Sequence, residues 1–128
     1  MKIKYFTKIK EKKCDLIFFN QLKTFVKNAE RVFFLSAKKN CIRGNHAHKI
    51  CSQYLISING NIKIKIDNGK IKKDKIIKEL KEMIKIKPMT WLTINLKKNQ
   101  KLCVICDKKY SKKEYIRDYE IFNKIKKD

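Results

Sequence analysis

Apolar and polar residues alternate through the middle of the chain. Positions 62–66 read Ile-Lys-Ile-Lys-Ile, and this period of two predicts a half-buried β-strand. The stretch before it, 53–58, leads into Asn59-Gly60, a dipeptide typical of a tight hairpin, and Asp67-Asn68-Gly69 indicates another turn. Short runs rich in β-branched and aromatic residues predict more strands, at 31–35, 83–86, 91–96 and 101–106.

Helical periodicity is confined to the C-terminal part of the chain. Within 111–125, Tyr115, Tyr119 and Phe122 recur at helical spacing, and Ser111 with Glu114 has the spacing of a capping box. The stretch 74–80 is compatible with a short helix or with a β-connection. Many short strands, close turns and little helix favour an all-β barrel or jelly roll with a short C-terminal helix.

Length and composition indicate one folded domain over residues 1–128. A hydrophobic fraction of 43% in 128 residues is enough to bury a core. No apolar run approaches the ~18 residues of a membrane span, and the N-terminal segment lacks the apolar region of a signal peptide. We therefore expect a cytoplasmic protein with no membrane partner, and we expect its five cysteines to be free thiols.

The net charge of +22 suggests an anionic partner. Nucleic acid is the first candidate, but base readout and bidentate phosphate binding favour arginine, and the chain has only Arg31, Arg43 and Arg117. The lysines are scattered along the whole chain, as on a solvated surface. We therefore expect no nucleic acid as the primary partner, and a positive field that favours an anionic substrate.

Both histidines of the chain lie in one motif, Arg43-Gly44-Asn45-His46-Ala47-His48-Lys49. Positions i and i+2 of a strand point to the same face, so the two imidazoles are expected to project together. Two functions suit such a pair: binding a metal, or transferring protons near neutral pH. The plainer alternative is that both histidines pack on the strand and bond to the backbone.

The residues around the motif argue against a metal. In many metal-binding jelly rolls a Glu and a third His follow His-x-His, whereas this chain has Gln53 at the Glu position and no third histidine. Cys103 and Cys106 have zinc-ligand spacing, but a strand would send them to opposite faces. We expect no metal and favour acid–base catalysis by His46 and His48.

Several colinear elements resemble the nucleotide-sugar 3,4-ketoisomerases of the cupin superfamily. The elements are Arg31–Phe34, the histidine motif, Gln53, the Asn59-Gly60 hairpin, Asp67-Asn68-Gly69, Pro88-Met89-x-Trp91 and Tyr115-Ile116-Arg117-Asp118-Tyr119 with Phe122. The resemblance implies a homodimeric jelly roll that works without a metal or other cofactor. It also implies conversion of dTDP-4-keto-6-deoxy-D-glucose to a dTDP-3-keto-6-deoxyhexose, with His46 and His48 as the catalytic pair.

The same resemblance suggests substrate contacts. By position, Arg31, Arg43 and Arg117 are candidates for binding the diphosphate or the sugar, although Arg117 could instead pair with its neighbour Asp118. Gln53 would orient a histidine or bond a sugar hydroxyl, or be a satisfied core amide. Trp91 would flank the pocket, although a lone tryptophan on a strand is more often part of a core.

The chain departs from the family pattern at several positions. Phe33 or Phe34 stands where the family often has Tyr, Leu92 where it often has His, and Lys13-Cys14-Asp15-Leu16 where an Arg-Gly-x-Leu element is usual. The sequence therefore leaves open the configuration of the product and which histidine is the base. Two other functions also stay open: a sugar-nucleotide epimerase-like cupin, and a non-catalytic cupin that binds a nucleotide sugar or another anion.

Overall fold

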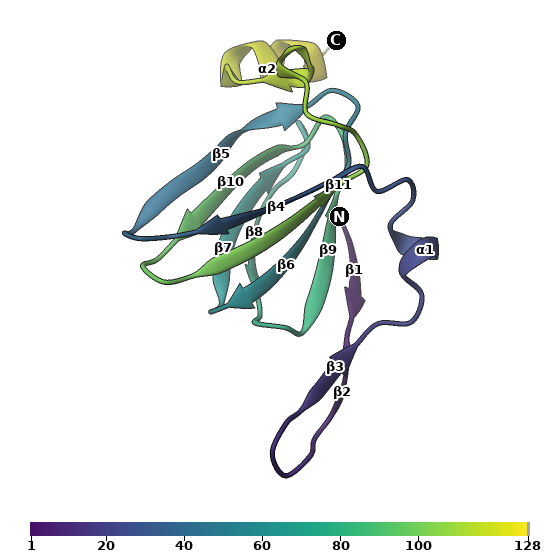
Figure 1. The fold of residues 1–128 in the computed structure, drawn as a ribbon. Helices are drawn as coiled ribbons and strands as arrows, with labels where there is room; N and C mark the ends of the chain where they lie inside the picture. Colours follow the sequence, from purple (N-terminus) through teal and green to yellow (C-terminus); the bar gives the residue numbers. More distant parts are fainter. Residues whose placement is uncertain (128) are drawn as a thin grey trace.

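Two antiparallel sheets of five strands face each other in the computed structural model, which describes residues 1–127 (Figure 1). The first sheet has the order β1 (Lys2–Tyr5), β9 (Glu82–Ile86), β6 (Gln53–Asn59), β11 (Lys101–Cys106) and β4 (Arg31–Ser36). The second has the order β12 (Tyr115–Ile116), β5 (Cys41–His48), β10 (Trp91–Leu96), β7 (Ile62–Asp67) and β8 (Lys72–Ile77). This architecture confirms the predicted all-β jelly roll.

The remaining elements lie outside the two sheets. Strands β2 (Thr7–Ile9) and β3 (Leu16–Phe18) form a hairpin that extends away from the sandwich, and α1 (Leu22–Phe25) leads back toward β4 (Figure 1). A 3₁₀ turn, η1 (Lys112–Glu114), precedes β12, and α2 (Tyr119–Lys127) lies across one end of the sheets (Figure 1). No helix in the described residues is long and apolar enough to cross a membrane.

The core lies between the sheets because each strand turns one set of alternate side chains inward. On β7, Ile62, Ile64 and Ile66 are buried while Lys63 and Lys65 are exposed, as the period of two predicted. Each such isoleucine contributes roughly 1.5–3 kcal/mol of transfer free energy. These residues pack with inward side chains of the other strands, including Leu55, Ile84, Leu92 and Leu102.

The C-terminal segment differs from its prediction. The expected helix over 111–125 is interrupted, because Tyr115 and Ile116 pair with His48 and Ala47 of β5. Ser111 makes no side-chain capping bond, and the helix begins only after Asp118, whose carboxylate accepts the backbone N–H groups of residues 120 and 121. Helical spacing of the aromatics was therefore misleading, because pairing with β5 decides the conformation of 115–116. The ambiguous stretch 74–80 is largely strand, as part of β8.

Candidate active site

A cavity of about 240 Å³ lies between the two sheets and contains most of the residues singled out in the sequence. Its walls come from β4, β5, β6, β10, β11 and β12. The lining includes Arg31, Arg43, His46, Gln53 and Arg117 among the expected site residues, together with Phe33, Leu92, Tyr110 and Tyr115. We call this cavity the histidine cavity.

His46 reaches the histidine cavity from an irregular part of β5. Gly44 and Asn45 both have positive φ, +84° and 54°, and the register between β5 and β10 shifts at this point. A Cβ at Gly44 would lie 2.6 Å from the carbonyl oxygen of Leu92, so only glycine fits. The Gly44 carbonyl lies 3.0 Å from His46 Nδ1. Because this carbonyl accepts a hydrogen bond from Nδ1–H, the other ring nitrogen of His46, Nε2, is the proton acceptor.

His48 lies beside His46 and is held by a carboxylate. Its side chain is 6% exposed, and Nδ1 is 2.6 Å from Oε2 of Glu114. The second oxygen of Glu114 accepts the backbone N–H groups of Ile50 and Cys51, at 2.8 and 2.7 Å. Burial alone would raise the pKa of Glu114, but the bonds from His48, Ile50 and Cys51 outweigh it and lower that pKa. Glu114 is therefore an anion that fixes the proton of His48 on Nδ1.

Sequence reasoning assigned Glu114 to a helix cap and so missed its contact with His48. The two residues are 66 positions apart, and only the pairing of β12 with β5 brings them together. Nε2 of His48 is buried and has no hydrogen-bond partner in residues 1–127. This nitrogen is closed to solvent, and His48 is not among the residues that line the histidine cavity; Tyr115, which does line it, packs on the His48 ring.

Tyr115 is a second site residue that the sequence did not reveal as one. Its ring centroid is 4.3 Å from that of His48 and 4.9 Å from that of His46, and the two imidazole centroids are 4.9 Å apart. The predicted juxtaposition of the two histidines is therefore present. The Tyr115 hydroxyl also accepts a long hydrogen bond, 3.4 Å, from Nη1 of Arg31.

Three arginines make the histidine cavity cationic. The guanidinium of Arg31 lies 4.5 Å from the ring centroid of Phe33, and that of Arg117 lies 4.5 Å from the ring centroid of Tyr115. Within the described residues, no aspartate or glutamate lines the cavity and no ion pair involves Arg31, Arg43 or Arg117. Planar guanidinium groups in this arrangement suit a phosphate or diphosphate.

Two other sequence positions are now placed. Gln53 is buried and lines the histidine cavity. Trp91 lies outside it and packs on Tyr119 and Phe122, with ring centroids 5.1 and 5.7 Å apart. Trp91 therefore belongs to a core cluster beneath α2. A core position was the alternative to the expected place beside the substrate pocket.

His48, Cys51 and Glu114 together offer three potential metal-ligand atoms within 4.8 Å of one another. Both oxygens of Glu114 are already bonded, to His48 and to the backbone of residues 50 and 51. A hydrogen bond with Cys106 and burial raise the pKa of the Cys51 thiol, so it stays protonated rather than becoming the thiolate that metals bind. This donor set therefore fits an internal hydrogen-bond network better than a metal.

The electrostatics of His46 differ from those of an ordinary histidine. Burial, followed by the nearby His48, lowers the pKa of His46 from 6.5 to about 4. His46 is therefore a neutral imidazole at physiological pH.

This shift predicts a pH dependence of stability. Between about pH 6.5 and about pH 4 only the unfolded chain protonates residue 46, so the free energy of unfolding decreases as the pH falls, by up to about 3 kcal/mol. Urea unfolding at several pH values should show that the free energy of unfolding decreases less at acid pH for His46→Asn than for the wild type. Equal losses in the two proteins would contradict the prediction, since general charge repulsion affects both alike.

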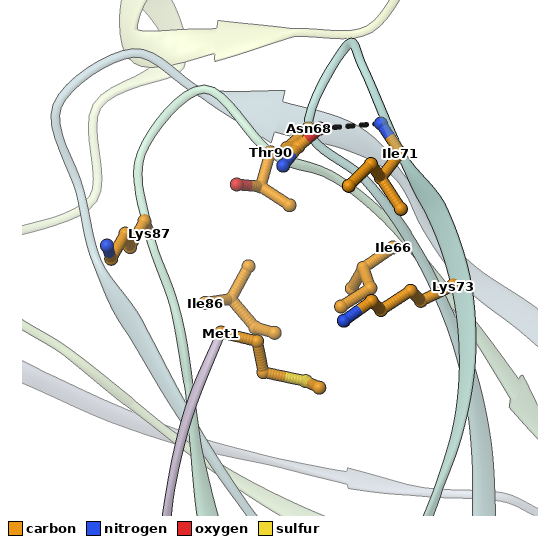
Figure 2. A pocket seen from close by; sticks show the side chains of 8 residues that line it. All are labelled: Met1, Ile66, Asn68, Ile71, Lys73, Ile86, Lys87 and Thr90. Atoms are coloured by element: carbon orange, nitrogen blue, oxygen red, sulfur yellow. Dashed lines mark hydrogen bonds between the residues drawn. The ribbon is translucent and has the colours of Figure 1, made fainter.

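A second cavity, of about 220 Å³, lies between the other pair of sheet edges. Figure 2 shows its lining: Met1, Ile66, Asn68, Ile71, Lys73, Ile86, Lys87 and Thr90. These side chains include cations but no histidine, carboxylate or thiol. They therefore offer no acid–base pair near neutral pH, and the histidine cavity is the better candidate for catalysis.

Known proteins resemble this chain over nearly its whole length. The family model FdtA (WxcM-like, C-terminal) matches residues 1–127. The TDP-4-oxo-6-deoxy-α-D-glucose-3,4-oxoisomerase of Aneurinibacillus thermoaerophilus is 26% identical over 125 residues, which cover 96% of this chain and 90% of that protein.

Solved structures agree with this similarity. WlaRA, a TDP-fucose-3,4-ketoisomerase from Campylobacter jejuni, is 30% identical with a TM-score of 0.82, covering 98% of this chain and 94% of that one. The sugar 3,4-ketoisomerase QdtA from Thermoanaerobacterium thermosaccharolyticum, in complex with TDP, is 25% identical with a TM-score of 0.86, covering 98% and 93%. With a family model that spans residues 1–127, these likenesses show that the chain is an isomerase and belongs to the FdtA (WxcM-like, C-terminal) family of sugar 3,4-ketoisomerases.

Proposed function

We propose that this isomerase converts dTDP-4-keto-6-deoxy-D-glucose to a dTDP-3-keto-6-deoxyhexose through its histidine pair. The observation that carries the proposal is the buried His48–Glu114 pair next to a cavity that His46 lines. An imidazole backed by a carboxylate is the kind of base that removes a hydrogen α to a ketone. The name of the Aneurinibacillus relative supports the choice of substrate.

The cationic wall of the histidine cavity fits the nucleotide part of this substrate. We assign Arg31, Arg43 and Arg117 to the diphosphate and the sugar, since guanidinium groups bind phosphate oxygens bidentately. We assign Gln53, which lines the cavity, to a sugar hydroxyl. The complex of the similar enzyme QdtA with TDP supports a dTDP-linked ligand.

We assign the proton transfer between carbons to His48. Its Nε2 takes the proton from C3, the C–H electron pair forms the C3=C4 double bond, and the carbonyl π pair moves to O4. The resulting imidazolium is stabilised by the Glu114 carboxylate and returns the proton to C4, while the proton of the O3 hydroxyl passes to O4 and the C3 carbonyl forms. His46 stays neutral because of its low pKa, and it hydrogen-bonds the sugar from the cavity.

NMR of the hexose in D2O tests this proposal and the two open alternatives. With dTDP-4-keto-6-deoxyglucose we expect deuterium at the position of proton transfer and a new 3-keto product. Exchange at C3 and C5 with inversion would identify an epimerase instead. An unchanged spectrum with saturable binding would identify a binding protein, and either result would overturn the isomerisation proposed here.

We also propose that the protein is a homodimer, as the family resemblance implies. Strand β4 is an edge of the first sheet, and its outward residues Val32 and Phe34 are 56% and 64% exposed. Apolar side chains on a sheet edge are suited to cover by a second copy. Light scattering in solution, which gives the mass of the particle, tests this assembly. The cytoplasmic location stays a prediction from the sequence.

A further inference from the structure

Strand β5 holds one residue more than its partner β10 beside the histidine cavity. On β10, Leu92 and Ile94 line the cavity and are two positions apart, as on a regular strand. Their partners on β5 are His46 and Arg43, which also line the cavity but are three positions apart. An extra residue on one strand of an antiparallel pair is a β-bulge.

The extra residue is Asn45, and both its backbone and its side chain hold the bulge. Thr93 pairs with Gly44 and the next pair is Leu92 with His46, so the register skips Asn45. The φ of Asn45 is 54°, a left-handed conformation that asparagine adopts more readily than most residues with a side chain. Its Oδ1 accepts a hydrogen bond of 2.9 Å from the Thr93 hydroxyl.

The bulge decides which way His46 points. In a strand without a bulge alternate residues share a face, so positions 43 and 46 would point to opposite faces. With the bulge at Asn45, Arg43 and His46 both face the cavity. The same irregular backbone places the Gly44 carbonyl 3.0 Å from Nδ1 of His46. A residue at position 45 that resists a positive φ would therefore disturb both the direction of the His46 ring and the hydrogen bond of its Nδ1.

We propose that Asn45 is a positioning residue for His46, and that the Thr93 hydroxyl holds Asn45 in place. Among residues 1–127, the lining of the cavity includes Gly44 and His46 but not Asn45, which is exposed. Asn45 thus acts through His46, by keeping the ring where Nδ1 donates to Gly44 and Nε2 can accept. The consequence for turnover rests on the proposed function, whereas the orientation of the ring does not.

Asn45→Val tests the proposal, because a β-branched residue at a positive φ is strained. In ¹⁵N NMR of the imidazoles we expect the wild type to carry the His46 proton on Nδ1, and the variant to show a mixture of both tautomers. Burial is the main cause of the low pKa of His46, so that pKa should rise from about 4 toward 6.5 as the ring leaves the cavity. We expect kcat/KM for isomerisation to fall about tenfold, because a displaced group loses its contact with the substrate. The signals of His48, which Glu114 holds, should stay unchanged.

Asn99→Val is the matched control. Asn99 is also exposed and has a positive φ, 73°, but it lies outside the lining of the histidine cavity. This variant should lose stability without a change in the His46 tautomer. Asn45→Gly and Thr93→Val remove the hydrogen bond between the two side chains but allow the positive φ, so each should shift the tautomer less than Asn45→Val does. Thr93→Ser keeps the hydroxyl and should restore the wild-type signal.

An unchanged His46 tautomer in Asn45→Val, or equal effects of Asn45→Val and Asn45→Gly, would overturn the role of Asn45. If Asn45→Val does not fold, Thr93→Val decides, and His46 signals identical to those of the wild type would overturn the proposal. Failure of the wild type to isomerise the sugar would overturn the proposed function and leave the NMR result standing. The two failures are therefore distinguishable.

Discussion

Replacement of His48 by Asn is expected to lower kcat for ketosugar isomerisation by about 1,000-fold while the protein stays folded. The amide of asparagine can still donate a hydrogen bond toward Glu114, so the buried carboxylate keeps a partner. It has no basic nitrogen to take the place of Nε2, so the C3 proton cannot be removed. We therefore expect C3 exchange in D2O to be lost together with product formation.

His46→Asn is the comparison that separates the two histidines. The pKa of His46, about 4, makes it a weak base, so we expect this variant to retain C3 exchange and to lose less turnover than His48→Asn. Steady-state rates and C3 exchange, measured for both variants, show which histidine is the base. Urea unfolding shows whether both variants stay folded. A larger loss in His46→Asn than in His48→Asn would transfer the base role to His46.

The sequence predicts those parts of this molecule that depend on one-sided burial. Strand β7 follows the alternation of Ile62, Ile64 and Ile66, because every second residue faces the other sheet. The two histidines were expected on one face for the same reason, and their rings do lie close together. These predictions need only local geometry, since a strand with period two has its faces set by the sequence itself.

The parts that the sequence did not predict depend on contacts between distant segments. Tyr115, Tyr119 and Phe122 have helical spacing, yet Tyr115 belongs to β12 and the other two belong to α2. Glu114 stands in a sequence context suited to a helix cap, and its partner His48 is 66 residues away. No periodicity can distinguish a cap from a buried ion pair when the deciding contact is a strand pairing with β5.

Glu114→Gln provides the other large effect that the structure predicts. The glutamine oxygen can still accept the backbone N–H groups of residues 50 and 51, and its NH2 group then faces Nδ1 of His48. Nδ1 must become the acceptor, which moves the imidazole proton to Nε2 and removes the proposed base. We expect kcat to fall about 100-fold with a modest loss of stability. ¹⁵N NMR of the imidazole should show the change of tautomer directly.

Glu114→Ala should behave differently, because it leaves two backbone N–H groups and the imidazole without a buried partner. We expect it to lose about 3–5 kcal/mol of unfolding free energy, which separates the stability role of the carboxylate from its catalytic one.

The matched control is Glu82→Gln. Glu82 is 2% exposed and bonds Lys75 and the backbone of Lys78, away from the histidine cavity. If burial of a carboxylate were all that mattered, Glu82→Gln and Glu114→Gln would affect kcat alike. An unchanged tautomer or full activity in Glu114→Gln would show that the ion pair with His48 only holds β12 against β5. A loss of activity confined to Glu114→Gln, with the imidazole proton on Nε2, would show that this carboxylate sets the base for the reaction.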